Sequence, residues 1–318
     1  MNILVTGAAG FVGSHLCESL LEEPTYHVTG VDTFIGPTPP SFKRMNLQNL
    51  LDHPRFCFMQ TNLLNTNLEQ LLNGVDAIYH LSAIPGVRSS WGDEFAPYMD
   101  NNILATQKLL ESVKSINIKR FIYISTSSVY GEKVGKVCED AALNPLSPYG
   151  ITKLTGEQLC RVYENSFGLP LVVLRYFTVY GPRQRPDMAF HRFMRQIYTN
   201  QPITIFGDGL QTRDFTYIDD CITGTKKALT ADGVIGETIN IGGKERSSIL
   251  GIISTLEKVT GRKALLSFSG RLKGEPHHTW ADISKAERLL EYSPAIPLKG
   301  GLEKEWNYIQ ELYRTNPT

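Results

Sequence analysis

The chain has 318 residues, of which 42% are hydrophobic and 20% charged, a composition typical of a globular protein with a sizeable core. Lysine and arginine together number 32, as do aspartate and glutamate, so the net charge gives no reason to expect nucleic acid or an anionic membrane as a partner. No apolar run is long enough to cross a bilayer, and residues 1–6 lead directly into a predicted strand without the features of a signal peptide. We therefore expect a cytoplasmic protein of two domains, or of one large α/β unit with an appendage.

The cysteines and histidines give no sign of a metal site or a disulfide framework. His277 and His278 are adjacent, so in a strand or loop they should point apart, and no carboxylate has a suitable spacing to join them as a ligand. The five cysteines are scattered and are interpreted as reduced thiols. They are Cys17, Cys57, Cys138, Cys160 and Cys221.

The first predicted element is a short apolar strand, Ile3 to Val5, followed by a glycine-rich turn and a helix from Ser14 to Leu21. Gly7 permits a tight turn, Gly10 lets backbone amides approach a pyrophosphate, and Gly13 lets the helix pack closely on the strand. The N-terminus of the helix adds partial positive charge. The spacing is G-x-x-G-x-x-G, which alone is a weak signal because glycine-rich turns are common.

A second strand, His27 to Val31, ends in Asp32, about twenty residues beyond the glycines. A carboxylate at that distance can bond the hydroxyl groups of an adenosine ribose. The same anion repels a 2′-phosphate, and the two residues that follow, Thr33 and Phe34, are not basic. The turn and the aspartate together therefore predict a site for NAD rather than NADP.

Strands and helices continue to alternate, as a doubly wound parallel sheet requires. Further strands are predicted at Arg55–Met59, Ala77–Leu81, Arg120–Ser125 and Leu171–Tyr176, with helical patterns between them at 66–73, 97–116 and 149–167. Two helical patterns near the C-terminus have inward apolar positions and are assigned to a smaller domain. They run from Asp282 to Leu290 and from Glu303 to Tyr313.

The stretch from Ser125 to Lys153 carries the strongest chemical signal. Tyr149 and Lys153 are four residues apart and lie on the same face of a predicted helix. A nearby cation favours the phenolate and lowers the phenol pKa from about 10, so Tyr149 could accept a proton from a sugar or alcohol hydroxyl. An isolated Y-x-x-x-K pattern more often marks two residues that merely line a helix. Here the glycine turn and Asp32 occur at compatible places and favour the catalytic interpretation.

With the run Thr-Ser-Ser-Val-Tyr-Gly at 126–131, these motifs resemble the extended short-chain dehydrogenase/reductase family, especially its NAD-dependent nucleotide-sugar epimerases and dehydratases. The resemblance covers essentially the whole chain. It implies a Rossmann-type α/β fold with a doubly wound parallel sheet and a smaller C-terminal α/β substrate domain. The implied NAD-binding domain comprises 1–176 with 213–240, and the implied UDP-sugar-binding domain comprises 177–212 with 241–318.

The same resemblance implies Thr126, Tyr149 and Lys153 as the catalytic triad and NAD as the cofactor. The implied cofactor-binding residues are Gly7, Gly10, Phe11, Val12, Gly13, Asp32, Asn62, Leu63, Leu81, Ser82, Ala83, Asn101, Ser125, Tyr149, Lys153 and Tyr176. Two positions depart from the family pattern. Ser82 replaces an expected alanine, and Asn62 stands where an adenine-binding aspartate is common. The carbonyl oxygen of Asn62 can still accept a hydrogen bond from the adenine amino group.

Residues 175–189 look most like the UDP-glucuronate 4-epimerase branch of the family, and residues 83–90 point the same way. Thr178 stands where related epimerases of neutral sugars usually have asparagine. With the neighbouring Ser127 and Ser128, its hydroxyl could bind the C6 carboxylate through neutral hydrogen bonds. Arg88 and Arg185 are candidate charged contacts, with an ordinary surface ion pair as the alternative for both.

The second half of the chain resembles the segments that hold UDP. Residues 203–208 resemble the segment that packs uracil against an aromatic ring, and Glu275 is an implied ribose contact. Arg213 and Arg271 match a diphosphate clamp, because planar guanidinium groups pair bidentately with phosphate oxygens. The full implied set for the substrate is Pro85, Gly86, Arg88, Thr126, Ser127, Ser128, Tyr149, Thr178, Arg185, Thr204, Phe206, Arg213, Arg271 and Glu275.

The implied activity is 4-epimerisation of a UDP-sugar through a transient 4-keto sugar, foremost UDP-glucuronate to UDP-galacturonate. UDP-glucose 4-epimerase and UDP-glucuronate decarboxylase stay open as alternatives, and a catalytically silent NAD-binding sensor or scaffold is a more distant one. A 4,6-dehydratase is disfavoured, because Ser127 and Ser128 stand where it needs an acid and a base. The resemblance also implies a homodimer through helices 97–116 and 149–167.

Overall fold

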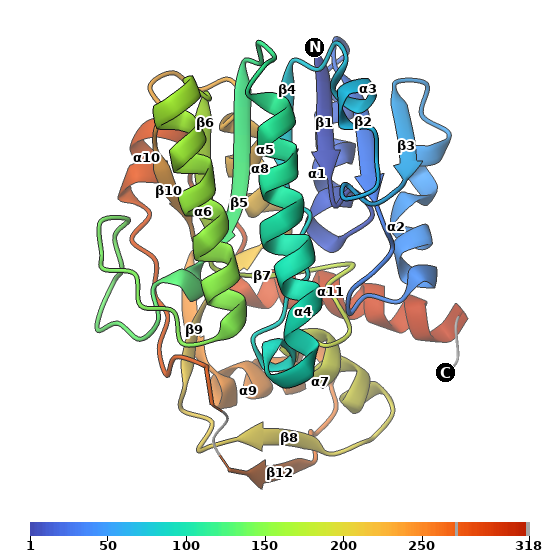
Figure 1. Ribbon diagram of the computed structural model, residues 1–318. Helices are drawn as coiled ribbons and strands as arrows, with labels where there is room; N and C mark the ends of the chain where they lie inside the picture. The colour runs from blue at the N-terminus through green and yellow to red at the C-terminus, as the bar shows by residue number, and fades with distance from the viewer. Residues whose placement is uncertain (271–272, 316–318) are drawn as a thin grey trace.

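The computed structural model describes residues 1–270 and 273–315 and is built around a seven-stranded parallel sheet (Figure 1). The strand order is β10-β6-β5-β4-β1-β2-β3, so the direction of winding reverses between β1 and β4. Such a reversal opens a crevice outside the carboxyl ends of the strands. The predicted doubly wound α/β fold is confirmed.

Six of the seven strands of the large sheet lie where the sequence predicts them, with ends that differ by one residue at most. Their bounds are β1 (Asn2–Thr6), β2 (His27–Asp32), β3 (Phe56–Gln60), β4 (Ala77–His80), β5 (Arg120–Thr126), β6 (Leu171–Tyr176) and β10 (Thr238–Ile241). The last of these was not predicted as a strand.

Helices cover both faces of the sheet, because alternate residues of each strand point in opposite directions. Ile3 and Val5 of β1 face one hydrophobic core, and Leu4 between them faces another. The first face is covered by α1 (Phe11–Leu21), α2 (Pro40–Leu51), α8 (Ile218–Lys227) and α10 (Ser284–Leu290). The second is covered by α3 (Leu68–Leu72), α5 (Ala105–Val113) and α6 (Pro148–Phe167), of which α5 and α6 stand side by side in Figure 1.

The predicted helix at 97–116 is built in three pieces. The short α4 (Ala96–Tyr98) leads into a π-helical segment, Met99–Leu104, and then into α5. Within the π-helical segment, Asn102 is buried, and its Oδ1 accepts a hydrogen bond from the backbone of Ile84 at 2.7 Å. Wide turns of this kind are frequent near functional sites, and an apolar pattern does not reveal them.

Two smaller sheets lie beyond the carboxyl end of the large one, with α7, α9 and α11 around them (Figure 1). In one, β9 pairs with β7 in parallel and with β11 antiparallel, and in the other β8 pairs with β12 in parallel. The bounds are β7 (Thr178–Tyr180), β8 (Ile203–Phe206), β9 (Thr212–Tyr217), β11 (Glu245–Ser248), β12 (Leu266–Ser269), α7 (Ala189–Tyr198), α9 (Ile249–Thr260) and α11 (Leu298–Thr315). The two predicted C-terminal helices correspond to α10 and α11, and α11 begins at Leu298 rather than Glu303.

Within the described ranges, no helix combines the length and the apolar composition that crossing a membrane needs. All five cysteines are free thiols, as predicted, and Cys57 and Cys138 are exposed.

The packing of α11 against the sheet that contains β7 can be tested at two adjacent glycines. A Cβ atom on Gly301 would lie 2.3 Å from the Tyr180 hydroxyl, whereas a Cβ atom on Gly300 would meet nothing within 4 Å. Gly301→Ala should therefore lower the free energy of unfolding by about 2 kcal/mol through overpacking. Gly300→Ala should leave it unchanged or raise it by about 0.5 kcal/mol, because alanine favours a helix. Urea unfolding of both variants checks this, and equal effects would contradict the described packing.

Candidate active site

A cavity of about 900 Å³ lies at the carboxyl ends of β1, β2, β4, β5 and β6 and extends to β7, β8 and β9. Every residue predicted to bind cofactor or substrate within the described part of the chain lines this cavity. The structure thus brings together positions as distant in the sequence as Gly7 and Glu275. Arg271 lies outside the described residues. The individual roles of the lining residues stay predictions.

The glycine turn forms the base of the cavity and has the geometry expected of a phosphate site. Gly7 has φ of +76°, and a Cβ atom on Gly13 would lie 2.1 Å from the carbonyl oxygen of Gly7. Only glycine permits both the turn and this close approach of α1. No side chain caps the N-terminus of α1, so its first amide groups are left for an anion in the cavity. This arrangement fits the diphosphate of a dinucleotide.

Asp32 ends β2 at the cavity and is paired with Lys43, a residue that sequence reasoning missed. The Asp32 Oδ1 atom accepts hydrogen bonds from the backbone of Phe34 at 2.7 Å and from Lys43 Nζ at 2.8 Å. Both side chains are buried. Because Asp32 neutralises the ammonium, the pair offers no uncompensated cation to a 2′-phosphate, in line with the predicted preference for NAD. Lys43 lies on α2, which was not predicted, and no local spacing connects it to Asp32.

Asn62 lies just beyond β3 and forms a local turn. Its Oδ1 atom accepts a hydrogen bond from the backbone of Leu64 at 2.9 Å. A carbonyl oxygen has a second lone pair, so the contact with an adenine amino group stays a prediction.

The N-terminus of α6 places Tyr149 at the cavity. Ser147 caps the helix by accepting a hydrogen bond from the backbone of Gly150 at 3.1 Å, and Pro148 occupies the first helical position. Tyr149 therefore lies in the first turn, and Lys153 follows one turn later. Both line the cavity together with Thr126 at the end of β5.

The charges around Tyr149 differ from those predicted. Burial raises the pKa of Tyr149, and the influences that lower it are the charge of Arg185 and a hydrogen bond to Thr126. The Lys153 Nζ atom instead lies 4.2 Å from the ring centroid of Tyr123. In the protein without ligands, Lys153 is not among the groups that shift the pKa of the phenol, and its predicted effect on Tyr149 stays a prediction. Helical spacing puts two residues on one face, but the direction of a long side chain depends on packing.

Lys153 is buried, and burial lowers its pKa to about 8. No hydrogen bond or ion pair joins its ammonium to another of the residues that the structure describes. Its N–H groups are therefore left for a ligand in the cavity.

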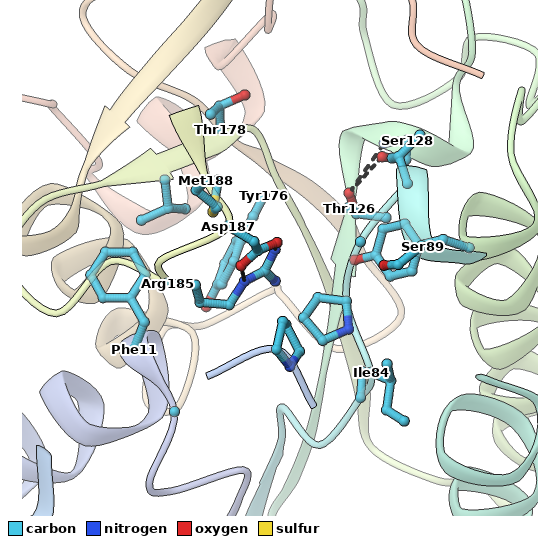
Figure 2. A pocket seen from close by; sticks show the side chains of 18 of the residues that line it. Phe11, Ile84, Ser89, Thr126, Ser128, Tyr176, Thr178, Arg185, Asp187 and Met188 are labelled. Atoms are coloured by element: carbon cyan, nitrogen blue, oxygen red, sulfur yellow. Dashed lines mark hydrogen bonds and ion pairs between the residues drawn. The ribbon is translucent and has the colours of Figure 1, made fainter. Parts of the chain in front are cut away.

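Hydroxyl groups and an arginine surround the space beside Tyr149. Thr126 and Ser128, joined by a hydrogen bond of 3.3 Å, lie on one side, and Thr178 and Arg185 lie on the other (Figure 2). Asp187 holds Arg185 through two contacts, of 3.0 Å from Nε and 2.9 Å from Nη2. Asp187 was not predicted, and it lines the cavity beside the arginine.

Basic side chains gather at the outer end of the cavity around Glu275. Its carboxylate accepts a hydrogen bond from Arg88 Nε at 2.6 Å and lies 3.4 Å from Arg213 Nη2. The Arg88 guanidinium also lies 4.9 Å from the ring centroid of Phe206. Arg88 thus forms the ion pair given as its alternative role, in the wall of the cavity. Arg192, which was not predicted, also lines this end, and burial with the nearby Arg88 lowers its pKa. A cluster of guanidinium groups fits a diphosphate.

The two adjacent histidines touch each other, so the prediction that they point apart is wrong. His277 Nδ1 lies 3.0 Å from His278 Nε2, and the backbone N–H groups of both residues donate to the carboxylate of Glu132. This shared acceptor holds the loop in a bend that the sequence did not reveal. No cluster of potential metal ligands occurs among residues 1–270 and 273–315.

Comparison with known proteins places the whole chain among nucleotide-sugar enzymes. The family model described as NAD dependent epimerase/dehydratase family matches residues 3–242. The chain is 61% identical to UDP-glucuronic acid 4-epimerase from Bacillus cereus, whose crystal structure in complex with UDP-glucuronic acid and NAD has a TM-score of 0.98 and overlaps 98% of this chain and 100% of that one. It is 60% identical over 314 residues, 99% of both chains, to an uncharacterized UDP-glucose epimerase, YtcB, of Bacillus subtilis. It is 42% identical over 315 residues, 97% of this chain and 96% of the other, to UDP-glucuronate 4-epimerase of Thermodesulfobacterium geofontis.

The buried pair in the cavity wall can be tested by unfolding. Asp32→Asn should lower the free energy of unfolding by about 3 kcal/mol, because it leaves the Lys43 ammonium buried without a counter-charge. The double variant Asp32→Asn/Lys43→Met should recover part of that loss. As a control, Glu257→Gln breaks the pair with the exposed Lys263 and should cost less than about 1 kcal/mol. Strictly additive single and double effects in urea unfolding would contradict the coupling.

Proposed function

Because the chain belongs to the NAD dependent epimerase/dehydratase family, we propose that it is an NAD-dependent 4-epimerase that converts UDP-glucuronate to UDP-galacturonate. The two relatives at about 60% identity are named for different sugars, so overall similarity does not choose the substrate. The observation that carries the choice is the set of hydroxyl groups at Ser127, Ser128 and Thr178, which line the same cavity as Tyr149. Several hydroxyl donors beside Arg185 suit a C6 carboxylate.

Tyr149 is the proposed base. As a phenolate it accepts the proton of the C4 hydroxyl, Thr126 orients that hydroxyl, and the charge of Arg185 favours the anionic form of the phenol. NAD, when bound, accepts a hydride from C4 and returns it to the opposite face of the sugar. Lys153 is proposed to bond the bound cofactor and to add positive charge beneath the phenol. Asp32 with Lys43 would hold the adenosine end, and the amide groups of the glycine turn would hold the diphosphate of the cofactor.

The substrate diphosphate must stay fixed while the 4-keto sugar turns over between the two hydride transfers. The guanidinium groups of Arg88, Arg192 and Arg213 provide that anchor at the outer end of the cavity. Holding the nucleotide firmly while the sugar moves uses binding energy away from the reacting carbon.

A glucuronate substrate adds a further demand, because its 4-keto form is a β-keto acid that can lose carbon dioxide. The carboxylate must therefore be held in an orientation unfavourable for breaking its carbon–carbon bond. We assign this role to Ser127, Ser128 and Thr178.

UDP-glucose 4-epimerisation is the second candidate. The Bacillus subtilis relative bears that name, and Arg185 already pairs with Asp187, so a neutral hydroxymethyl group would leave no unpaired arginine behind.

The same proposal includes the domain division, the assembly and the location of the protein. The NAD-binding domain comprises 1–176 with 213–240, and the UDP-sugar-binding domain comprises 177–212 with 241–318.

Two copies of the chain are proposed to pair through the helical segments 97–116 and 149–167. These segments expose the apolar side chains of Leu104, Ile151 and Val162. We place the homodimer in the cytoplasm.

Chromatography of the products from UDP-glucuronate, UDP-glucose and UDP-xylose tests the proposed activity. We expect UDP-galacturonate from UDP-glucuronate, and no pentose product. Tyr149→Phe should lower turnover about a thousandfold by removing the base. Tyr163→Phe is the matched control on the same helix, because its hydroxyl bonds to Glu111 away from the cavity. A pentose as main product would identify a decarboxylase, and conversion of UDP-glucose alone would identify the second candidate.

The proposed carboxylate site predicts a change in product as well as in rate. The double variant Ser127→Ala/Thr178→Ala should either bind UDP-glucuronate at least roughly tenfold more weakly, since hydrogen bonds to a charged group are each worth about 1.5–3 kcal/mol, or release a decarboxylated pentose. Turnover of UDP-glucose, which has no carboxylate, serves as the control and should change little. Unchanged turnover of UDP-glucuronate without pentose formation would show that these hydroxyls do not hold the carboxylate.

A further inference from the structure

A fully buried ion pair lies directly beneath the candidate active site. Glu157 is on α6, one turn beyond Lys153, and Arg175 is on β6. Arg175 donates to Glu157 from Nε at 3.0 Å and from Nη2 at 2.7 Å. The hydroxyl of Ser125, a cavity-lining residue, donates to the same carboxylate. The carboxylate therefore connects the cavity wall to the interior of the sheet.

The pair is held in place by neighbouring strands. Arg175 Nη1 donates to the Tyr130 hydroxyl at 2.9 Å, and that hydroxyl donates to Asn240 Oδ1 at 2.7 Å. Ser125, Arg175 and Asn240 belong to β5, β6 and β10, which are adjacent in the sheet. Glu157 thus has little freedom to move away from Ser125 and Lys153.

We propose that Glu157 is a positioning residue of the active site, which directs the Ser125 hydroxyl away from the cavity and supplies the negative charge beneath Lys153. This inference rests on the proposed function, because it concerns how the Tyr149 and Lys153 pair is kept competent for proton transfer. A buried ion pair is weak evidence of a stabilising role, since apolar residues of similar volume often serve a fold as well. Glu157 also accepts a hydrogen bond from Ser125 in the cavity wall, a contact that an apolar residue could not replace.

Among the titratable groups around Lys153, Glu157 is the one that carries a negative charge. Tyr123 from β5, His80 from β4 and Cys160 from α6 also face the ammonium. Burial raises the pKa of Tyr123 and of Cys160 and lowers that of His80 to about 3, so all three are neutral at physiological pH. Burial lowers the pKa of Lys153, and Cys160 and Glu157 both raise it; of these two, Glu157 is the one held as an ion by its pairing with Arg175.

The sign of the resulting pH effect follows from the mechanism. The reaction needs Tyr149 as phenolate and Lys153 as ammonium, so activity is lost at alkaline pH when Lys153 loses its proton. A negative charge at Glu157 favours the ammonium and moves that loss to higher pH. A residue that served folding alone would change activity equally at every pH.

The test is the pH profile of kcat for UDP-glucuronate epimerisation by full-length protein with NAD. Glu157→Gln should move the alkaline limb down by roughly one pH unit. Glu157→Asp keeps the negative charge, but its shorter side chain cannot reach Ser125, so it should lower kcat without changing the pH at which kcat falls on the alkaline side. Ser125→Ala should have the same effect. Glu164→Gln, which breaks the pair with Arg161 farther along α6, is the matched control and should change neither.

A folded Glu157→Gln variant with the wild-type limb would overturn the proposal. If that variant does not fold, Glu157→Asp decides, because wild-type kcat in the aspartate variant would show that the position of the carboxylate does not matter. An inactive wild-type protein would instead refute the proposed function. The inference about charge is then tested by NMR titration of the labelled Lys153 side chain, whose pKa should fall in Glu157→Gln and stay unchanged in Glu164→Gln.

Discussion

Parallel pairing is the constraint on which the rest of this structure depends. Each crossover returns the chain to the same end of the sheet, so all seven strands release their following loops at one edge. The reversal of winding between β1 and β4 keeps those loops from filling the space between them. Residues as distant in the chain as Gly7, Ser125 and Thr178 therefore meet in one cavity, and the smaller sheets close it from the opposite side.

Within the cavity, burial sets the value of every charge. Asp32 with Lys43 in the cavity wall and Glu157 with Arg175 beneath it are paired by contacts shorter than about 3 Å, as charges withdrawn from water must be, and the more exposed Arg185 is paired with Asp187. Lys153 and Arg192 are the exceptions among the described residues that line the cavity, since no hydrogen bond or ion pair joins their side-chain cations to the protein. The Lys153 ammonium, one helical turn beyond Tyr149, is free to bond a ligand that enters the cavity, and the proton chemistry is proposed for this part of the cavity.

The predicted substrate contacts divide into two groups with different physical tasks. The hydroxyl groups around Tyr149 carry no charge of their own and are proposed to bond the sugar end of the substrate. The guanidinium groups around Glu275 carry full charges and suit a diphosphate that stays in place. Separating the mobile part of the substrate from the anchored part in this way is what an epimerisation by rotation demands.

The sequence alone determined the features that depend on neighbours along one strand or one helix turn. The glycine turn, Asp32 at the end of β2, the strands of the large sheet up to β6 and the cap that starts α6 all follow from local pattern and backbone geometry. The short β12, Leu266–Ser269, alternates apolar and polar residues but is exposed throughout, and it was missed, as was α2. Only the tertiary structure decided which charges act on one another. Lys43 pairs with Asp32, the charge of Arg185 acts on Tyr149, and Glu132 accepts hydrogen bonds from the backbone of the histidine pair. In each case the two partners are too far apart in the sequence for a motif to connect them. Long side chains take their direction from packing and burial, which exist only once the strands have assembled.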